Sequence, residues 1–339
     1  MTASRWGRTG RVTRVGLVLG AGGVVGQAYH AGVLASMEHD LGWDPRTADV
    51  IVGSSAGSLT GTLLRLGVPA SDLASMLVES PLSVEGADVF ATIGLDDVPL
   101  PGFSVLDVLR PWRPPTARLV ARIARRPLAF RPGVAAATLL PSGRIDLMSK
   151  AVGLGELVGD RWPERLWLCV ARRDDGGRVV LGRPGSPKAT IVQAVAASCA
   201  IPGYFSPVVI GGVSYFDGGV HSPTSADVLR TERLDVVVVV SPMSSARRLP
   251  VIDGPLRWAA HRRLMGEVRR LEAGGATVVR YEPDHRAVAV MGVNAMADDR
   301  SHLVVQQAFL EAGRLSARAD MRAKLAPLAT RTSRQIRSS

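Results

Sequence analysis

Ser55 is the residue whose surroundings first suggest chemistry. It lies between Gly53 and Gly57, after the apolar run Val50–Val52 and before a helical pattern over Ser58–Leu66. A nucleophilic serine is commonly held on such a strand-to-helix turn, because small residues two places before and after it let the helix pack close to the strand. The helix N-terminus favours the negative charge that develops in acyl transfer. A small-residue turn with a capping serine fits the same five residues, so this pattern alone leaves both interpretations open.

A glycine-rich loop, Gly20–Gly26, follows the apolar run Val15–Leu19 and precedes a helix that we expect to begin near the last glycine. Loops of this kind expose backbone N–H groups. A dinucleotide-binding loop needs glycine at its first, third and sixth positions and an acidic residue after the second strand. Val25 occupies the sixth position and the second strand ends in Gly-Ser-Ser, and both features argue against a nucleotide site. We predict instead that the N–H groups of Gly22 and Gly23 form an oxyanion hole.

A serine hydroxyl is a weak nucleophile until a neighbouring group accepts its proton, so the sequence must also contain a base. Asp217 ends the short predicted strand Val213–Phe216 and is followed by two glycines, whose backbone can aim a carboxylate into a site. None of the histidines has a setting that marks it as a triad member. His221, four residues after Asp217, is the second choice of base. The six histidines are His30, His39, His221, His261, His285 and His302.

The Asp-Gly-Gly sequence of Asp217 occurs a second time. Asp175–Gly177 lies between the predicted strands Leu166–Arg172 and Arg178–Leu181. A hairpin turn favours Asp-Gly for conformational reasons alone. Spacing does not fully separate the two copies, and the choice between them stays open at this point.

The elements that must position these residues alternate along the chain. Short Val, Ile and Leu runs, typical of buried strands, are separated by Ala-rich helical stretches. Strands separated by helices indicate an α/β fold with a largely parallel sheet. The predicted buried strands are Val15–Leu19, Val50–Val52, Leu166–Val170, Val236–Val240 and Thr277–Tyr281.

The chain has 339 residues, 46% of them hydrophobic, which suffices for one large core. We expect a single catalytic domain over residues 14–328, with flexible polar tails over 1–13 and 329–339. The stretch 86–144 is rich in Pro and Arg and is the predicted insertion or lid.

The net charge of +11 raises the question of a polyanionic partner. We do not predict nucleic-acid binding, because no recognisable motif for it is present and the aromatic content is only 5%. Cys169 and Cys199 are too few for a disulfide framework, and no residues have metal-ligand spacing. No uncharged run approaches membrane-spanning length, and glycines interrupt residues 15–25. We expect a cytoplasmic protein without metal or cofactor, with peripheral membrane contact left open.

Residues Thr116–Arg126 form an amphipathic helical pattern. Its apolar face carries Leu119, Val120, Ile123 and Ala124, and its basic face Arg118, Arg122, Arg125 and Arg126. Such a helix suits an anionic membrane surface, with Arg110, Arg113 and Arg131 adding charge nearby. An ordinary surface helix whose apolar stripe packs on the core fits better, because the segment is short. Contact with an anionic membrane through Arg113–Arg131 is therefore the second interpretation.

The glycine loop, the serine turn and the Asp-Gly-Gly, in this order, resemble the patatin-like phospholipase family. The block Ala197–Phe205 ahead of Asp217 and the block Ser222–Asp227 after it extend the likeness. The resemblance covers about Arg14–Val240, with a weaker echo at Val293–Asp298, and none is recognised over residues 86–144.

The resemblance implies a three-layer α/β/α sandwich and a Ser-Asp dyad without histidine, in which Ser55 attacks and Asp217, rather than Asp175, accepts the proton. It implies a lipid acyl hydrolase working through an acyl-enzyme, with a lipid acyl ester as substrate. A lipid acyltransferase with the same dyad and a catalytically weak lipid-binding protein are the alternatives. Val25 stands where the family commonly has a basic residue and Ala21 where glycine is usual. Both leave the backbone donors intact.

Overall fold

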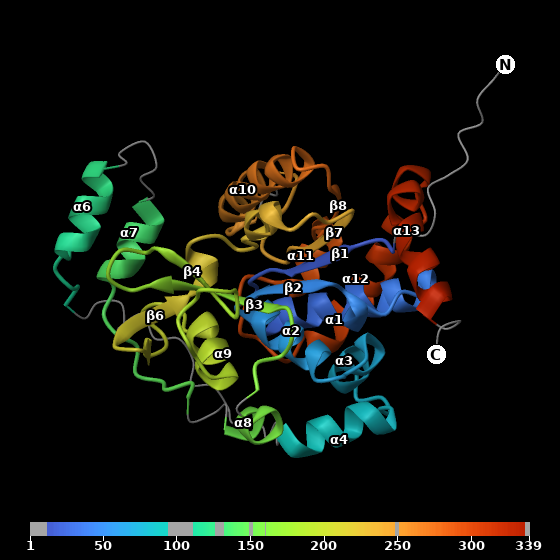
Figure 1. Cartoon of the computed structure of the whole chain (residues 1–339), viewed down its shortest axis with the longest axis horizontal. Helices are drawn as coiled ribbons and strands as arrows, with labels where there is room; N and C mark the ends of the chain where they lie inside the picture. Colours follow the sequence, from blue (N-terminus) through green and yellow to red (C-terminus); the bar gives the residue numbers. More distant parts are fainter. Residues whose placement is uncertain are drawn as a thin grey trace.

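The computed structural model describes residues 12–93, 111–125, 132–148, 152–159, 161–247 and 251–335. An eight-stranded sheet forms the centre of the protein, in the order β5-β6-β3-β2-β1-β7-β8, with β4 beside β3 (Figure 1). The strands are β1 Val15–Leu19, β2 Val50–Ser54, β3 Leu166–Arg172, β4 Arg178–Leu181, β5 Val208–Ile210, β6 Val213–Asp217, β7 Val236–Val240 and β8 Thr277–Tyr281.

Five neighbouring strands of the sheet, β3, β2, β1, β7 and β8, run parallel. Strands β4 and β6 pair antiparallel with β3, and β5 pairs antiparallel with β6. The predicted α/β fold with a mostly parallel sheet is confirmed. The predicted bounds of β1, β7 and β8 coincide with the observed ones, whereas β2 and β3 each extend two residues beyond the apolar run.

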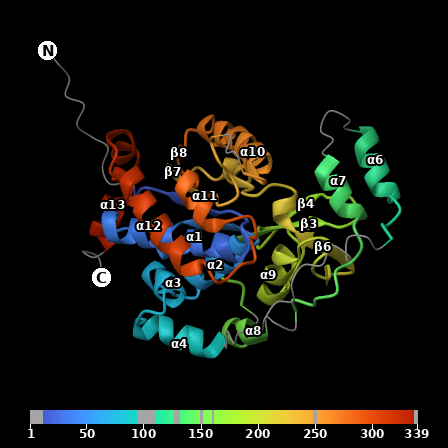
Figure 2. The same ribbon diagram turned by 180° about the vertical axis from the view of Figure 1, so that it is seen from behind.

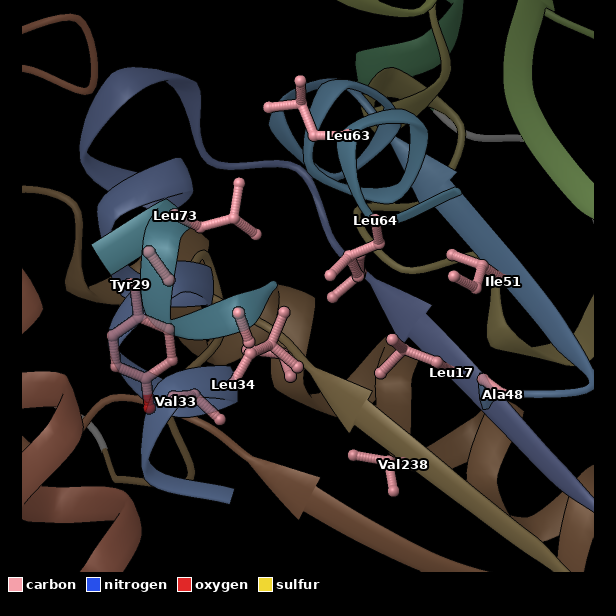
Figure 3. Packing of buried hydrophobic residues seen from close by; sticks show 14 of the residues in the cluster. Leu17, Tyr29, Val33, Leu34, Ala48, Ile51, Leu63, Leu64, Leu73 and Val238 are labelled. Carbon is pink, nitrogen blue, oxygen red and sulfur yellow. The ribbon is translucent and has the colours of Figure 1, made fainter. Parts of the chain in front are cut away.

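Helices cover both faces of the sheet, which is why the central strands are apolar at almost every position. In β1, Leu17 belongs to the core beneath α1, α2 and α12, and Val18 belongs to the core beneath α10. Figure 3 shows the first core, where Leu17 and Val238 face Leu34. The helices are α1 Gly23–Leu41, α2 Ala56–Arg65, α3 Ala70–Leu77, α4 Val84–Ile93, α6 Ala117–Arg125, α7 Pro132–Leu139, α8 Val152–Val158, α9 Ile191–Cys199, α10 Gly254–Glu272, α11 His285–Met291, α12 Ser301–Ser316 and α13 Ala319–Gln335.

Helix α12 lies along α1 on the outer side of the first core, as the reverse view shows (Figure 2). Helix α13 follows it and continues through residues 329–335, where the sequence predicts a tail. The buried side chains of Met321, Leu325 and Leu328 hold the start of this helix on the core. Once a helix is nucleated, each further residue adds a hydrogen bond, so the polar residues that follow extend it. No helix among the described residues is long and apolar enough to cross a membrane.

Helices α6 and α7 lie beside the β3–β4 hairpin at one end of the molecule (Figures 1 and 2). The Thr116 hydroxyl donates a hydrogen bond to the Asp174 carbonyl at 2.5 Å, and the Arg122 guanidinium donates one to the Asp175 carbonyl at 2.9 Å. These helices belong to the predicted insertion 86–144, of which residues 94–110 and 126–131 lie outside the described residues.

Candidate active site

Ser55 occupies a sharp turn between β2 and α2. Its backbone has φ 53° and ψ −124°, a conformation that residues other than glycine rarely adopt and that stores strain. Its N–H donates to the Ser198 hydroxyl at 2.9 Å, and that hydroxyl donates to the Cys169 carbonyl at 2.8 Å. This buried chain of hydrogen bonds holds the strained turn. Ser198 lies in the block Ala197–Phe205 that extends the family resemblance, but the sequence alone assigns it no positioning role.

The glycines on either side of Ser55 are required by close packing. A Cβ atom on Gly57 would overlap the Leu19 carbonyl of β1. A Cβ atom on Gly53 would lie 2.5 Å from the Gly57 carbonyl oxygen. Helix α2 therefore approaches β1 and β2 more closely than any side chain would allow, which confirms the reason predicted for small residues at these two positions.

The glycine-rich loop leaves β1 toward the same turn. Two backbone hydrogen bonds fix the start of the loop: the Gly20 N–H donates to the Val240 carbonyl at 2.9 Å, and the Ala21 N–H donates to the Pro223 carbonyl at 2.7 Å. Helix α1 begins at Gly23, three residues earlier than the sequence predicts. Within the described part of the chain, the N–H groups of Gly22 and Gly23 have no hydrogen-bond acceptor. Two donors are thus free at the helix N-terminus, where an anion is favoured.

Strand β3 brings Asp217 to Ser55. Strand β4 pairs with Leu168 through Ala171 of β3, so β2 and β6 must share the opposite edge. On that edge β2 ends at Ser54, opposite Cys169, and β6 ends at Asp217, opposite the next residue, Val170. Because β2 runs parallel to β3 and β6 antiparallel, the two strands end head to head. Ser55 comes directly after the end of β2, and Asp217 is the last residue of β6, so the two residues lie at the same place on this edge of β3.

The carboxylate of Asp217 is buried, with 5% of the residue exposed. Burial raises its pKa from 3.8 to about 6, while hydrogen bonds from the Ser55 side chain and the Gly219 N–H act in the opposite direction. The Gly219 N–H lies 2.7 Å from Oδ1. The described residues place no ion-pair partner beside this carboxylate. Burial likewise raises the pKa of the neighbouring Cys199 thiol to about 12, and the charge of Asp217 adds to the effect, so that thiol stays neutral.

The second-choice base faces elsewhere. His221 Nδ1 lies 3.2 Å from the Gly176 carbonyl in the β3–β4 hairpin. His221 lies near Asp227. Burial raises the pKa of Asp227, but the hydrogen bond and charge of Arg178, together with the charges of Arg270 and His221, outweigh burial and lower it. His221 does not line the cavity described next.

A cavity of about 400 Å³ joins the predicted site residues. Its lining is mostly apolar and combines Ser55, Asp217 and the glycine loop with residues of α10. The lining residues are Ala21, Gly22, Gly23, Ser55, Ile201, Pro202, Asp217, Gly219, Val220, Pro223, Met243, Leu256, Ala259, Ala260, Arg263 and Ala295. A nucleophile, a carboxylate base and free N–H donors beside a mostly apolar cavity are the components of acyl transfer.

The basic helix, α6, differs from the predicted arrangement. Of its four predicted apolar side chains only Leu119 is buried, and Val120 is 55% exposed. Two arginines of its basic face turn toward acidic residues of the hairpin, with Arg118 Nη1 4.0 Å from Asp174 and Arg122 Nη1 3.7 Å from Asp175. Attraction to these carboxylates explains the orientation. Arg110, Arg126 and Arg131 lie outside the described residues.

The sequence matches the model of one protein family, described as patatin-like phospholipase, over residues 17–89 and 107–230. The two segments cover more than half of the chain. This chain belongs to the patatin-like phospholipase family. Membership implies, at the level of the family, a lipid acyl hydrolase. The match also corrects the limits of the resemblance, since residues 107–144 belong to the matched region and only 90–106 fall between the two segments.

No curated protein matches the sequence. Solved structures with a similar fold include VipD from Legionella pneumophila, at 12% identity and a TM-score of 0.39, covering 90% of this chain and 67% of that one. Human GIVD cytosolic phospholipase A2 has 11% identity and a TM-score of 0.41, covering 95% and 63%. ExoU in its complex with SpcU from Pseudomonas aeruginosa has 18% identity and a TM-score of 0.34, covering 97% and 60%. This patatin-like chain thus spans about two thirds or less of the chains it resembles.

Proposed function

We propose that this patatin-like chain hydrolyses carboxylic esters of lipids through an acyl-enzyme on Ser55. Asp217 is the general base, and the N–H groups of Gly22 and Gly23 form the oxyanion hole. One observation carries the proposal: these four residues line a single, mostly apolar cavity. Its apolar wall suits an acyl chain.

The first half of the reaction transfers the acyl group to the protein. Ser55 Oγ attacks the ester carbonyl while its proton passes to Asp217, and the carbonyl oxygen becomes an oxyanion that accepts hydrogen bonds from Gly22 and Gly23. The carbon–oxygen bond to the alcohol then breaks, and Asp217 returns the proton to the departing oxygen. In the second half, water gives a proton to Asp217 and its oxygen attacks the acyl carbon. The bond between that carbon and Ser55 Oγ then breaks, Asp217 returns the proton to Oγ, and the fatty acid leaves.

The raised pKa of Asp217 supports this role. An ordinary aspartate, with a pKa near ~3.9, is too weak a base to take a proton efficiently at neutral pH. The pKa of about 6 for Asp217 lies closer to neutrality, while the carboxylate still stays mostly ionised at pH 7.

The decisive experiment combines hydrolysis of a lipid panel with labelling by an alkyl fluorophosphonate, which reacts with activated serines. We expect Ser55→Ala to lower kcat by about 10⁴-fold or more and to abolish labelling. Ser71→Ala, at an exposed serine of α3, is the matched control and should retain both. Labelling that survives Ser55→Ala would contradict the assignment of the nucleophile.

The same experiment separates the two alternative functions. An acyltransferase forms the same acyl-enzyme and passes the acyl group to an alcohol, so labelled lysolipid added to the assay would appear as a diacyl product. A lipid-binding protein without catalysis would bind lipid but take up no label.

For the membrane, we propose that the end of the molecule carrying α6 makes peripheral contact with an anionic lipid surface. Trp112 and Val120 are more than half exposed there, and Arg118 and Arg125 are exposed beside them. An exposed apolar pair flanked by arginines suits the boundary between head groups and acyl chains. Replacing Arg118 and Arg125 by Gln should weaken sedimentation with anionic vesicles and leave hydrolysis of a soluble ester unchanged. Equal sedimentation of the wild type and the doubly substituted variant would contradict the proposed membrane contact.

A further inference from the structure

Helix α10 contains one buried acidic residue, Glu267, of which 2% is exposed. It follows the cavity-lining Arg263 by four residues, and residues at this spacing share a face of a helix. Glu267 forms no salt bridge with any described residue, and a buried carboxylate costs free energy unless other groups satisfy it. The hydrogen bonds that this carboxylate accepts therefore show which part of the protein it holds.

One short segment, residues 222–226, supplies three donors to this carboxylate, and we call it the anchored segment. Ser222 Oγ donates to Oε1 at 2.5 Å, Thr224 Oγ1 donates to Oε2 at 2.6 Å, and the Ala226 N–H donates to Oε2 at 2.8 Å. Within the segment, Ser225 has a positive φ of 51°, which costs free energy for a residue other than glycine. The carboxylate thus holds every second residue of a strained segment.

The anchored segment supports the glycine-rich loop. Its Pro223 carbonyl accepts a hydrogen bond from the Ala21 N–H at 2.7 Å. Ala21 directly precedes Gly22 and Gly23, whose N–H groups are the proposed oxyanion donors. A Cβ atom on Gly20 would lie 3.3 Å from the Pro223 carbonyl oxygen, so the segment packs against the backbone of the loop. The position of the segment therefore fixes the start of the loop.

The anchored segment also continues the turn that carries Asp217. The Ser222 N–H donates to the Gly218 carbonyl at 3.2 Å, and the Gly219 N–H donates to the carboxylate of Asp217 at 2.7 Å. A Cβ atom on Gly219 would lie 2.7 Å from Ala21 Cβ, so this turn packs directly on the glycine-rich loop. Displacement of the segment would disturb the base and the oxyanion donors together.

We propose that Glu267 is a positioning residue for acyl transfer, which holds the oxyanion donors and the base in place through the anchored segment. The proposal rests on the proposed function. Glu267 does not itself line the cavity, so it acts through the residues that it binds. Oxyanion donors stabilise the tetrahedral intermediate only when they lie within hydrogen-bond distance of the forming oxyanion. Their displacement lowers kcat, whereas ground-state binding of the ester depends on the apolar cavity and is retained.

The first test measures kcat and KM on a soluble ester. We expect Glu267→Ala to lower kcat about 10- to 100-fold, less than the loss of a whole oxyanion donor, and to change KM less than about twofold. Glu267→Gln keeps the length of the side chain and one oxygen acceptor, and should fall between the wild type and Glu267→Ala. A rise in KM with unchanged kcat would overturn the proposal.

Val268→Ala, at the next residue of α10, is the matched control. It truncates a side chain buried in the core beneath this helix, so it should lower the melting temperature and leave kcat unchanged. A loss of kcat in Val268→Ala equal to that in Glu267→Ala would assign the effect to general destabilisation and overturn the positioning role.

An alkyl trifluoromethyl ketone, whose adduct with a serine is a tetrahedral oxyanion, supplies a second measurement. Its inhibition constant should rise in each Glu267 variant by the factor by which kcat falls. Thr224→Val removes one donor to the carboxylate and nearly keeps the shape of the side chain, so it should lower kcat about two- to tenfold. This variant and Glu267→Gln carry the test if Glu267→Ala does not fold. Unchanged kcat in both would overturn the proposal.

Hydrogen–deuterium exchange separates failure of this proposal from failure of the proposed function. In the folded Glu267 variants, the peptide that covers residues 20–26 should exchange faster than in the wild type, because the Ala21 N–H loses its fixed acceptor. If the wild type cleaves no ester but this difference is present, the hydrolase is wrong and Glu267 holds the loop for another function. If the wild type cleaves esters, and neither kcat nor this exchange changes in the variants, the positioning role is wrong and the hydrolase stands.

Discussion

Asp175-Gly176-Gly177 and Asp217-Gly218-Gly219 have the same sequence and make the same local hydrogen bond. In each segment, aspartate Oδ1 accepts from the N–H two residues later, at 2.8 Å from Gly177 and at 2.7 Å from Gly219. Asp217 ends β6 and Asp175 lies three residues after the end of β3, and both strands belong to the same sheet. Local turn chemistry therefore does not distinguish them.

Their charge environments are opposite. Asp175 lies in the β3–β4 hairpin, 2.9 Å from Arg172 and 3.7 Å from Arg122. Burial raises the pKa of Asp175, but the hydrogen bonds from Arg172 and Gly177 and the charges of both arginines outweigh it, so the pKa is lowered. Asp217 is buried with no cation beside it among the described residues, and burial raises its pKa to about 6. The same tripeptide is a hairpin turn held by arginines in one place and a carboxylate suited to proton transfer in the other.

Activity should separate the two aspartates most strongly. Asp217→Asn removes the proton acceptor and should lower kcat on a soluble ester by roughly a hundred- to ten-thousand-fold, the usual contribution of a general base. Asp175→Asn, the matched control in the same tripeptide, should change kcat less than about twofold, because Asp175 lies in the β3–β4 hairpin and does not line the cavity of Ser55. If Asp217→Asn retains full activity while substitution of His221 abolishes it, the dyad is wrong.

The pH dependence of hydrolysis sharpens the comparison next. A base with a pKa of about 6 is lost on acidification, so kcat/KM should fall about tenfold per pH unit below that value. The measurement is a pH–rate profile of the wild type between pH 4 and 8. Asp175→Asn should give the same acidic limb. A limb near the ordinary pKa of aspartate would show that burial does not tune Asp217.

The substitutions Asp217→Asn and Asp175→Asn should change the free energy of unfolding with opposite signs. This is the smallest of the three expected effects. The folded pKa of Asp217 lies above the unfolded value of 3.8, so the folded state binds the proton more tightly and loses stability as pH rises from about 4 to 6. At pH 7 this cost is fully present, and Asp217→Asn should raise the free energy of unfolding by about 1–3 kcal/mol. The gain should vanish below the unfolded pKa.

Asp175→Asn supplies the opposite sign. Its folded pKa is lowered, so the charged form stabilises the folded state above the unfolded pKa, and this contribution is lost as pH falls through the folded value. The substitution should therefore destabilise the protein at pH 7. Urea unfolding of both variants at pH 7 and pH 4 measures these differences. A loss of stability in Asp217→Asn at pH 7 would contradict the uncompensated burial of this carboxylate.

Much of the sheet was predictable from the sequence. Strands β1, β7 and β8 are uninterrupted apolar runs, because helices cover both faces of a parallel sheet and every side chain is buried. The turn at Ser55 and the glycine loop were predictable as well, since Gly53, Gly57 and the loop glycines occupy positions where a side chain would collide. The end of α13 and the orientation of α6 were not, because a short polar helix takes its contacts from whatever surface lies beside it.

The sequence by itself determined which residues have reactive groups and which local turns carry them. The reason is that strand and helix periods and glycine positions depend only on residues close together in the sequence. It did not determine what surrounds each group. Only the tertiary structure joined β2 and β6 head to head on one edge of β3. It also placed arginines beside Asp175 and, within the described part of the chain, none beside Asp217, and it brought α10 to the cavity of Ser55. Burial and charge act through space, so the pKa of a carboxylate depends on residues far away along the chain.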